Sequence, residues 1–521
     1  MFVILSLSIL LLTLLVMAVL RLTRRPAAFS WLAAALGALL SWASTPLWQI
    51  DLPTRLPVSS WPFSTLFHTT PALQADSFSW LYAISLVALA SAVVLTSPAR
   101  LAVLSPISWF GAVALGLVGL LAVMADNILT LSLMWMAIDL LEYLNTLRMT
   151  RSSSNSERAV ISLAFRAAGT GFALWAAVIS ARTGLPTSLQ QTPPEAWLFL
   201  LLAVGLRLGV IPLHLPYRQD LALRRGIGSS LRLTAAATSL VVLARLPAGD
   251  VDETIRIFLL ALVALAAIYA AWKWFSSSDE ISARPYWIIG MSALSLAAAL
   301  RGNPQGSAAW GVSLVLFGGL LFLYSSRQIW LTRLLAGFLL CLLSLPFTLT
   351  ASGWLGNFPW PALFWPLFLT AHVMLIAGYI RHLSRSGDTP LSELPRWSQV
   401  SYPLGLATLM ITVLLTGLWG WPGSLQIGNW SVALLMVGLT IPIGIAYWKL
   451  NRFLPTPEEQ STLAQVSHFV RFQEFLARLL WAIYRLFRRL VEYVSSLLEG
   501  DGGLLWTLLL LLILITALRG L

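Results

Sequence analysis

Six ionisable side chains lie within or beside long apolar runs, where a charge is costly and therefore marks a functional candidate. They are Asp139, Glu142, Arg166, Arg207, His214 and Arg232. Asp139 and Glu142 are three residues apart, so a helix presents them on neighbouring parts of one face. Carboxylates that face cations across neighbouring helices can line a polar route for protons or cations such as sodium. The sequence therefore predicts an ion path near the middle of a membrane.

Three of the basic residues can also be explained by a structural role instead of a role in an ion path. Arg232 and Arg245 lie at the two ends of one apolar run, so the simpler interpretation is that both side chains extend to the membrane surface. His214 follows Pro212 directly and is equally consistent with a turn at the cytoplasmic surface.

Two further arginines lie deeper in their runs. Arg166 can form a structural ion pair with Asp139 or Glu142, which is the alternative to a path. Arg207 lies well inside its run and needs an anionic partner or water. In the second half of the chain, His372 is nearly alone within its apolar run.

Membrane-spanning helices must position these residues. The 521 residues are 58% hydrophobic and 10% charged, with a mean hydropathy of +0.81, whereas a soluble domain carries about 25% charged residues. Apolar runs of about 20 residues must be helical, because lipid leaves backbone groups no other partners. We expect an all-α polytopic membrane protein of about sixteen spans, at 2–20, 28–45, 77–95, 106–124, 127–148, 159–180, 196–211, 231–247, 255–272, 286–300, 309–325, 332–350, 361–380, 401–420, 430–448 and 503–518.

The basic residues lie mostly in alternate loops between these runs. This pattern is typical of cytoplasmic loops, and it places the N-terminus outside and the loop after every odd span in the cytoplasm. It also explains the net charge of +12 without a nucleic-acid partner. Cys341 is the only cysteine, and no histidine cluster or glycine-rich phosphate loop occurs. We therefore expect no metal and no cofactor.

Two spans contain an internal proline, Pro212 and Pro346. Proline breaks a helix, and transporters use such broken helices in pairs, one in each inverted repeat. Proline is also simply common in membrane helices, which is the competing interpretation. Each proline lies in the fourth span of a block of five, so we predict two inverted five-helix repeats, spans 4–8 and 9–13, with broken helices 7 and 12.

The chain then divides into six segments. These are N-terminal helices (1–105), a first repeat (106–250), a second repeat (251–380), two further helices (381–460), an amphipathic surface helix (461–500) and a final span (501–521). The amphipathic segment has apolar residues at helical spacing, but five arginines interrupt the run between 469 and 494 too often for a span. Such a helix lies along a membrane surface or a partner.

The order of several motifs resembles the antiporter-like membrane subunits of NADH-quinone oxidoreductase, especially subunit L, and their relatives in multisubunit cation/proton antiporters. The family's asparagine-led fifth helix matches at Asn127, Leu131, Trp135 and Tyr143, its sixth helix at FRAAGTGF (165–172), and its seventh at Pro212, Leu213 and His214. The twelfth helix resembles LSLPFTLTASGW (343–354). The sixteen spans with a late surface helix also resemble subunit L.

This chain departs from the family at the positions where the family carries titratable side chains. By spacing, the helix-5 glutamate falls on Met136, the helix-7 lysine on Arg207 and the helix-8 histidine on Leu231. The lysine of the second repeat falls on Gly318. A desolvated lysine can release its proton, but arginine stays protonated. An Arg207–Asp139 pair would therefore be a locked ion pair.

The resemblance implies a membrane subunit of a respiratory or antiporter complex in a prokaryotic plasma membrane, with other membrane subunits as partners. Its own translocation of protons or cations is either retained in altered form or reduced to scaffolding, and no catalytic site is expected. The alternative is a polytopic glycosyltransferase that uses a lipid-linked sugar. Its candidate site is the outside loop 46–75, with Asp51, Arg55, His68 and Asp76 beside Trp48 and Trp61.

Overall fold

The computed structural model describes residues 1–57, 70–100, 105–149, 153–183, 188–214, 225–246, 252–326, 328–359, 364–385 and 390–450. These ranges hold fifteen α-helices and one two-stranded sheet, so the predicted all-α polytopic architecture is confirmed. Residues Met1–Ile445 form one compact unit. The second unit, Ala446–Leu521, contributes the end of one helix to the described residues.

Each of the first fifteen predicted spans coincides with a helix of its own. In the first half these are α1 (Phe2–Leu22), α2 (Ala27–Ser44), α4 (Ser77–Thr96), α5 (Pro106–Val123), α6 (Ile128–Met149), α7 (Ser153–Arg182), α8 (Pro194–Leu208) and α9 (Arg225–Arg245). In the second half they are α10 (Glu253–Ser276), α11 (Glu280–Leu300), α12 (Pro304–Leu323), α13 (Ile329–Phe338), α14 (Phe364–Leu383), α15 (Arg396–Leu418) and α16 (Trp430–Leu450). The predicted amphipathic helix and the sixteenth span lie outside the described residues.

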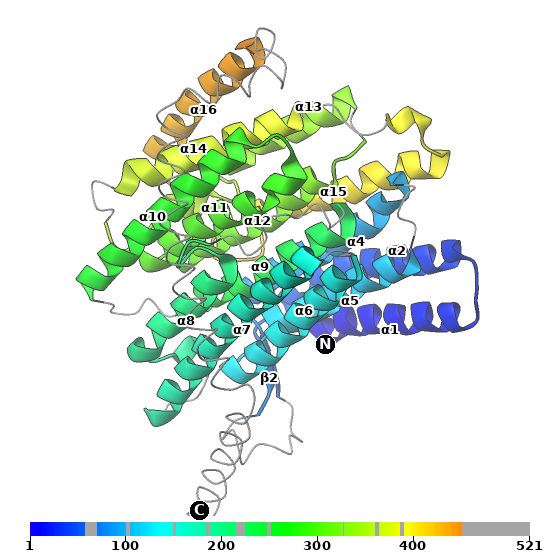
Figure 1. The fold of residues 1–521 in the computed structure, drawn as a ribbon, viewed down its shortest axis with the longest axis horizontal. Helices are drawn as coiled ribbons and strands as arrows, with labels where there is room; N and C mark the ends of the chain where they lie inside the picture. The colour runs from blue at the N-terminus through cyan, green and yellow to red at the C-terminus, as the bar shows by residue number, and fades with distance from the viewer. Residues whose placement is uncertain are drawn as a thin grey trace, which may run out of the picture. The chain divides into compact units, whose positions relative to one another are not determined.

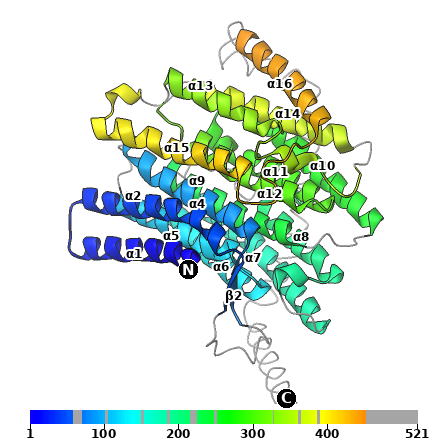
Figure 2. The ribbon, with the colours of Figure 1, turned by 180° about the vertical axis from the view of Figure 1, so that it is seen from behind.

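Eleven helical segments in the described ranges are long and apolar enough to cross a bilayer. Three of them, α4, α9 and α12, are buried over 94%, 100% and 100% of their most apolar stretch, whereas α1 is buried over 28%. Figures 1 and 2 show these three helices surrounded by the others. Helices α4 and α12 have apolar residues on every side and so pack well all round, whereas α9 is buried although it carries Arg225, Arg232 and Arg245.

Short elements connect the helices on the side that the sequence predicts to be outside. The 3-10 helix η1 (Thr45–Ile50) leads into strand β1 (Thr54–Pro57), which pairs antiparallel with β2 (Ala72–Ala75). The register places Arg55 opposite Gln74. A single bridge between Leu73 and Ala125 attaches this hairpin to the turn before α6. A second bridge, between Asn127 and Ser188, attaches that turn to the connection between α7 and α8.

Both proline-containing spans are broken, as predicted. Helix α8 ends at Leu208, where Gly209 adopts a left-handed φ of 75° that a side chain disfavours, and Pro212 lies in the turn beyond. Helix α13 ends at Phe338, and the short 3-10 helix η6 (Leu339–Leu342) follows it directly. Turns that contain Pro346 then lead to the 3-10 helix η7 (Ala351–Trp354).

Polar side chains between α11 and α12 hold the far side of the second break. Arg301 is buried and donates to the carbonyl oxygens of Trp354 at 3.2 Å, Leu355 at 3.0 Å and Phe358 at 3.1 Å. Asn303 Nδ2 donates to Ser352 O at 2.8 Å and to Leu355 O at 2.7 Å. Backbone carbonyls freed by the break thus find partners inside the protein, as a membrane interior demands.

We expect Arg301→Ala to destabilise the protein strongly, because it leaves buried carbonyl groups unpaired. Each such group costs about 1–3 kcal/mol. Thermal unfolding of the purified chain in detergent measures the loss. The control is Arg256→Ala, because Arg256 lies 4.1 Å from the centre of the Phe358 ring and 3.6 Å from the exposed Glu253 carboxylate. An equal loss in both variants would contradict the role assigned to Arg301.

Candidate functional site

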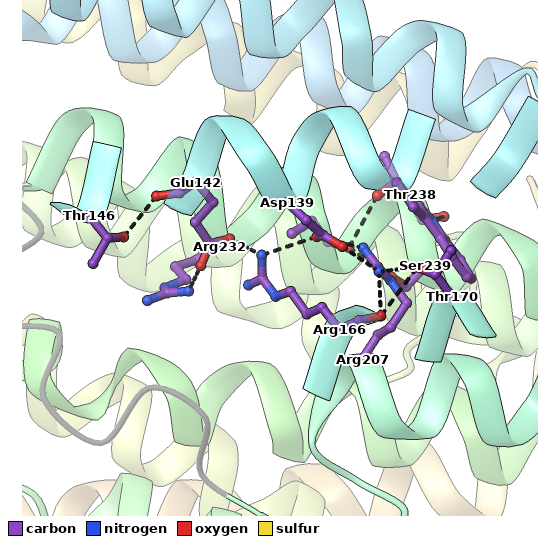
Figure 3. Close-up of polar contacts among 11 residues, drawn as sticks. Asp139, Glu142, Thr146, Arg166, Thr170, Arg207, Arg232, Thr238 and Ser239 are labelled. Atoms are coloured by element: carbon purple, nitrogen blue, oxygen red, sulfur yellow. Dashed lines mark hydrogen bonds and ion pairs between the residues drawn. The ribbon is translucent and has the colours of Figure 1, made fainter. Parts of the chain in front are cut away.

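Five of the six predicted path residues come together in the interior of the first half. Asp139 and Glu142 point from α6, Arg166 from α7, Arg207 from α8 and Arg232 from α9 (Figure 3). All five are buried, with 3% to 6% of their surface exposed. We call these five residues the ladder, because their charges alternate in the order Arg207, Asp139, Arg166, Glu142, Arg232.

The pair of Arg207 and Asp139 forms one end of the ladder. Arg207 donates from Nη1 to Asp139 Oδ2 at 2.7 Å and from Nη2 to Oδ1 at 2.8 Å. This two-pronged contact is the strongest arrangement that the two groups can make. The guanidinium also donates to Thr170 Oγ1 at 3.0 Å and lies 4.3 Å from the centre of the Trp135 ring. Arg207 and Asp139 therefore form a buried ion pair.

Arg166 joins this end of the ladder to the other. Its Nη1 lies 3.4 Å from Asp139 Oδ1 and also donates to Glu142 Oε2. Glu142 Oε1 in turn accepts a hydrogen bond from Arg232 Nη1. The sequence left open whether Arg166 pairs with Asp139 or Glu142, and the structure shows contacts with both.

The simpler interpretation of Arg232 and Arg245 as surface-seeking side chains is wrong. Helix α9 begins at Arg225 rather than at 231, so Arg232 lies about two turns inside the helix and pairs with Glu142. Arg245 is also buried and pairs with Asp76 at 3.0 Å. Hydropathy predicted a later start for α9, because the first two turns of the helix contain charged and polar residues.

The close packing of α7 on α8 depends on a glycine of the FRAAGTGF motif. A Cβ atom at Gly169 would lie 2.6 Å from Arg207 Cγ and 3.0 Å from Ala203 O. No side chain fits there without displacing backbone or the stem of Arg207. Gly169 therefore allows Arg207 to pass α7 and reach Asp139.

The chemistry of the ladder is unfavourable for a proton relay. Arginine keeps its proton in proteins, so three of the five groups do not exchange one. A proton that moved onto either carboxylate would break an ion pair and leave a guanidinium unpaired in a low-dielectric interior, which costs several kcal/mol. The geometry is that of a series of ion pairs that connects four helices.

His214, the sixth predicted residue, lies in the turn after the broken helix. Its Nδ1 lies 2.9 Å from Pro212 O, and its ring stacks on Phe165 with centroids 4.2 Å apart. The other ring nitrogen has no hydrogen-bond partner among the described residues. His214 thus makes no hydrogen bond to the ladder, and a role in a path remains a prediction.

Two positions where the family places titratable groups have opposite surroundings. Met136 is 58% exposed and faces away from the protein interior, whereas Asp139, one turn later, faces inward. Leu231 is fully buried beside Arg232. The inward-facing carboxylate of α6 thus lies about one helical turn beyond the position where the resemblance predicts a glutamate.

The third such position, Gly318 on α12, is closed by aromatic packing. A Cβ atom at Gly318 would lie 2.9 Å from Trp287 Nε1, 3.1 Å from Leu233 Cδ2 and 3.3 Å from Phe322 Cε2. The Trp287 indole donates to Leu314 O at 3.1 Å, which fixes it in place. No long side chain fits at residue 318 in this arrangement.

His372 on α14 lies in an aromatic setting. It is 1% exposed, and its ring centroid lies 4.7 Å from that of Trp310 and 6.0 Å from that of Trp354. Neither of its ring nitrogens has a hydrogen-bond partner within the described residues.

Two buried charges on α11 were missed by the sequence analysis. Glu280 pairs with Arg225 at 2.8 Å, and Arg284 donates to Ser229 Oγ at 2.9 Å. Both residues precede the apolar stretch that was expected to begin at 286, so they were counted as loop. The signal was Asp279, an N-cap residue whose carboxylate accepts from Ser282 N at 2.8 Å.

The described part of the outside loop gives the glycosyltransferase alternative no support. Asp51 binds the N-terminal amine and accepts from Phe2 N at 2.7 Å. Arg55 pairs with Asp126 at 2.5 Å, and Asp76 caps α4 while it pairs with Arg245. The described carboxylates thus have structural partners, while Trp61 and His68 lie outside the described residues.

We expect Asp139→Asn to lower the free energy of unfolding by about 3–5 kcal/mol, because it leaves Arg207 buried without its carboxylate. The double variant Asp139→Leu with Arg207→Met removes both charges and is expected to recover much of that loss. Equilibrium unfolding in detergent of Asp139→Leu alone, Arg207→Met alone and the double variant measures the coupling. Additive losses would show that the two side chains do not act as a pair.

We expect Gly318→Ala to destabilise the protein by about 1–3 kcal/mol, because the added methyl group overpacks against Trp287. The matched control is Gly171→Ala on α7, where a Cβ atom would meet nothing within 4 Å. That change is expected to be neutral or stabilising by up to about 1 kcal/mol, because alanine favours a helix. Thermal unfolding of both variants tests the difference, and a stable Gly318→Ala protein would contradict the packing.

No protein-family model and no curated protein matches the sequence. Among solved structures, a chain of the Mrp complex from Dietzia sp. DQ12-45-1b is similar, with a TM-score of 0.66 and 17% identity, over 100% of this chain and 63% of that chain. A chain of the membrane-bound sulfane sulfur reductase, an archaeal respiratory membrane complex, is similar with a TM-score of 0.63 and 15% identity, over 98% of this chain and 99% of that chain. This chain therefore shares its fold with subunits of an Mrp complex and of a respiratory membrane complex.

Proposed function

We propose that this chain is a membrane subunit of a multisubunit respiratory complex of the NADH-quinone oxidoreductase type or of a cation/proton antiporter complex. In this role it binds other membrane subunits and carries no redox cofactor. The ladder holds the helices of the first half together, and proton or sodium translocation through this chain is reduced or absent. A prokaryotic plasma membrane is the proposed location.

The alternation of charge along the ladder carries the proposal. Asp139 and Glu142 each contact two arginines, and no lysine or histidine intervenes in the ladder. Closure of the space at Gly318 adds to it, since the second half has no room there for a long titratable side chain. Both features favour a structural subunit over an active translocator.

Similarity to solved complexes supports the assembly part of the proposal. Both similar chains come from complexes, one named as Mrp and one described as a respiratory membrane complex. This chain spans 63% of the length of the Mrp chain, so the activity of that longer protein carries over only as a proposal. Purification of a tagged chain from its native membrane under mild detergent is expected to recover other membrane subunits with it.

We expect the number of protons pumped per electron transferred to stay unchanged when Asp139→Asn or Arg207→Gln is built into the reconstituted complex. Neither change removes a group that carries protons, according to the proposal. Counting protons per electron corrects for complexes lost through misassembly. Asp252→Asn serves as the control, because Asp252 is an exposed helix cap of α10.

A lower proton-to-electron ratio in either ladder variant, with the control unchanged, would contradict a purely structural ladder. It would favour the alternative that Asp139 and Arg207 belong to a working ion path. Recovery of the tagged chain without any other subunit would contradict the assembly role itself.

A further inference from the structure

A series of polar contacts joins four helices on the side that the sequence predicts to be cytoplasmic, which we call the inner side. Glu280 of α11 pairs with Arg225 of α9 at 2.8 Å and lies 3.9 Å from Arg385, which follows α14. Arg385 also donates from Nη2 to Ser277 O, between α10 and α11, at 2.6 Å. His382, in the last turn of α14, contacts Arg385 in turn. These contacts connect α9 of the first half to α10, α11 and α14 of the second half.

The His382 ring is fully buried between a carbonyl group and a guanidinium. Its Nε2 lies 3.0 Å from Trp274 O of α10, and its Nδ1 lies 2.8 Å from Arg385 Nη1. Arginine donates hydrogen bonds but never accepts them, so Nδ1 is the acceptor. Nε2 therefore carries the hydrogen that binds Trp274 O, since a neutral imidazole has one donor and one acceptor. The two partners together select a single neutral tautomer of His382.

Helix α14 packs closely on α10 at this point. The ring centroids of His382 and Trp274 are 4.3 Å apart. A Cβ atom at Gly378 would lie 2.7 Å from Trp274 Nε1 and 3.1 Å from Phe275 Cα, so this glycine allows the two helices to approach. Arg381 adds a hydrogen bond from the end of α14 to Phe275 O. His382 therefore lies within a packed contact between two helices rather than at an open surface.

The charges around the ring disfavour an additional proton on it. Arg381 and Arg385 act on the ring from the end of α14, and Asp279, the cap of α11, is the carboxylate that acts on it. Lys273 lies in the last turn of α10 and adds positive charge on this side. Glu280 is engaged by two arginines. A proton on Nδ1 would point at the Arg385 guanidinium, so repulsion would replace the present hydrogen bond.

We propose that His382 is a pH-sensitive latch between the inner ends of α10 and α14, closed while its ring is neutral and opened when the ring takes up a proton. With hydrogens on both nitrogens the ring no longer accepts from Arg385, and the two positive groups separate. Arg385 then also loses the position from which it binds Ser277 O and approaches Glu280. This goes beyond the proposed function, since it concerns a response of the chain to pH on its inner side, whether or not the chain conducts ions.

Acid favours the open state of the latch, because the open state binds a proton that the closed state excludes. An exposed imidazole has a pKa of about 6.5, so it is mostly neutral at about pH 7.5 and mostly protonated at about pH 5.5. The closed ring has a guanidinium at Nδ1 and stays neutral. Linkage between proton binding and opening then shifts the equilibrium toward the open state by about tenfold over this range.

Hydrogen exchange of the full chain in detergent, followed by mass spectrometry, tests the latch. Exchange in segments 273–280 and 379–385 is compared at about pH 7.5 and about pH 5.5, after correction for the intrinsic effect of pH on exchange. We expect the unaltered chain to exchange about tenfold faster in both segments at the lower pH. His382→Gln keeps an amide donor for Trp274 O but does not titrate, so it is expected to lose this rise. No partner subunit is needed, so the result is independent of whether the chain joins a larger complex.

His372→Gln is the matched control, because His372 is a second buried histidine of α14 but lies beside Trp310 and Trp354 instead of a guanidinium. We expect this variant to keep the rise of the unaltered chain. His382→Asn is the second test variant for the case that His382→Gln does not fold, since its amide oxygen can accept from Arg385 without titrating. A rise that persists in a folded His382 variant, or that is absent from the unaltered chain, would overturn the proposal.

Discussion

Ion pairing in a low-dielectric interior governs the arrangement of α6 to α9. A buried charge without a partner costs several kcal/mol, so each guanidinium must meet a carboxylate, a hydroxyl or a backbone carbonyl. The ladder satisfies this demand by alternating sign from Arg207 to Arg232. The alternation in turn requires four helices at fixed heights, and Gly169 provides the clearance that lets α7 and α8 approach.

The same constraint shapes the two ends of the membrane region. Backbone carbonyls released by a broken helix cannot be left unpaired in lipid, and at the second break Arg301 and Asn303 bind them. At the outer end of the first half, Arg245 binds carbonyls from two connections and one carboxylate. Arginine suits these places because its planar head donates in several directions and never loses its charge.

The two halves differ in how their interiors are filled. The first half keeps charged groups but links them in pairs that hold their protons, whereas Trp287 and Phe322 close the second half at Gly318. This chain thus shares its fold with chains of an Mrp complex and a respiratory membrane complex, while the charged groups of its ladder lie in ion pairs. Fold and activity are separable, because packing sets the first and titratable groups set the second.

Hydropathy alone determined the helical architecture and the positions of the first fifteen helices, because lipid permits no other structure for long apolar runs. Pro212 and Pro346 likewise marked the breaks, since proline cannot continue a helix. The sequence also singled out four members of the ladder by their depth in apolar runs, whereas it placed Arg232 at the end of its run. Its errors lie at charged helix starts, where α9 and α11 extend beyond the apolar stretch.

Tertiary structure decided which charges meet. Asp139 and Arg207 are far apart in the chain, and only the packing of α7 against both α6 and α8 brings them within 2.7 Å. The sequence also did not predict three further features. These are the direction of the Met136 side chain, the packing of the Trp287 indole against Gly318 and the pairing of Arg245 with Asp76. Spacing along one helix gives the face of a residue, but partners across helices depend on rotation and height, which no local pattern encodes.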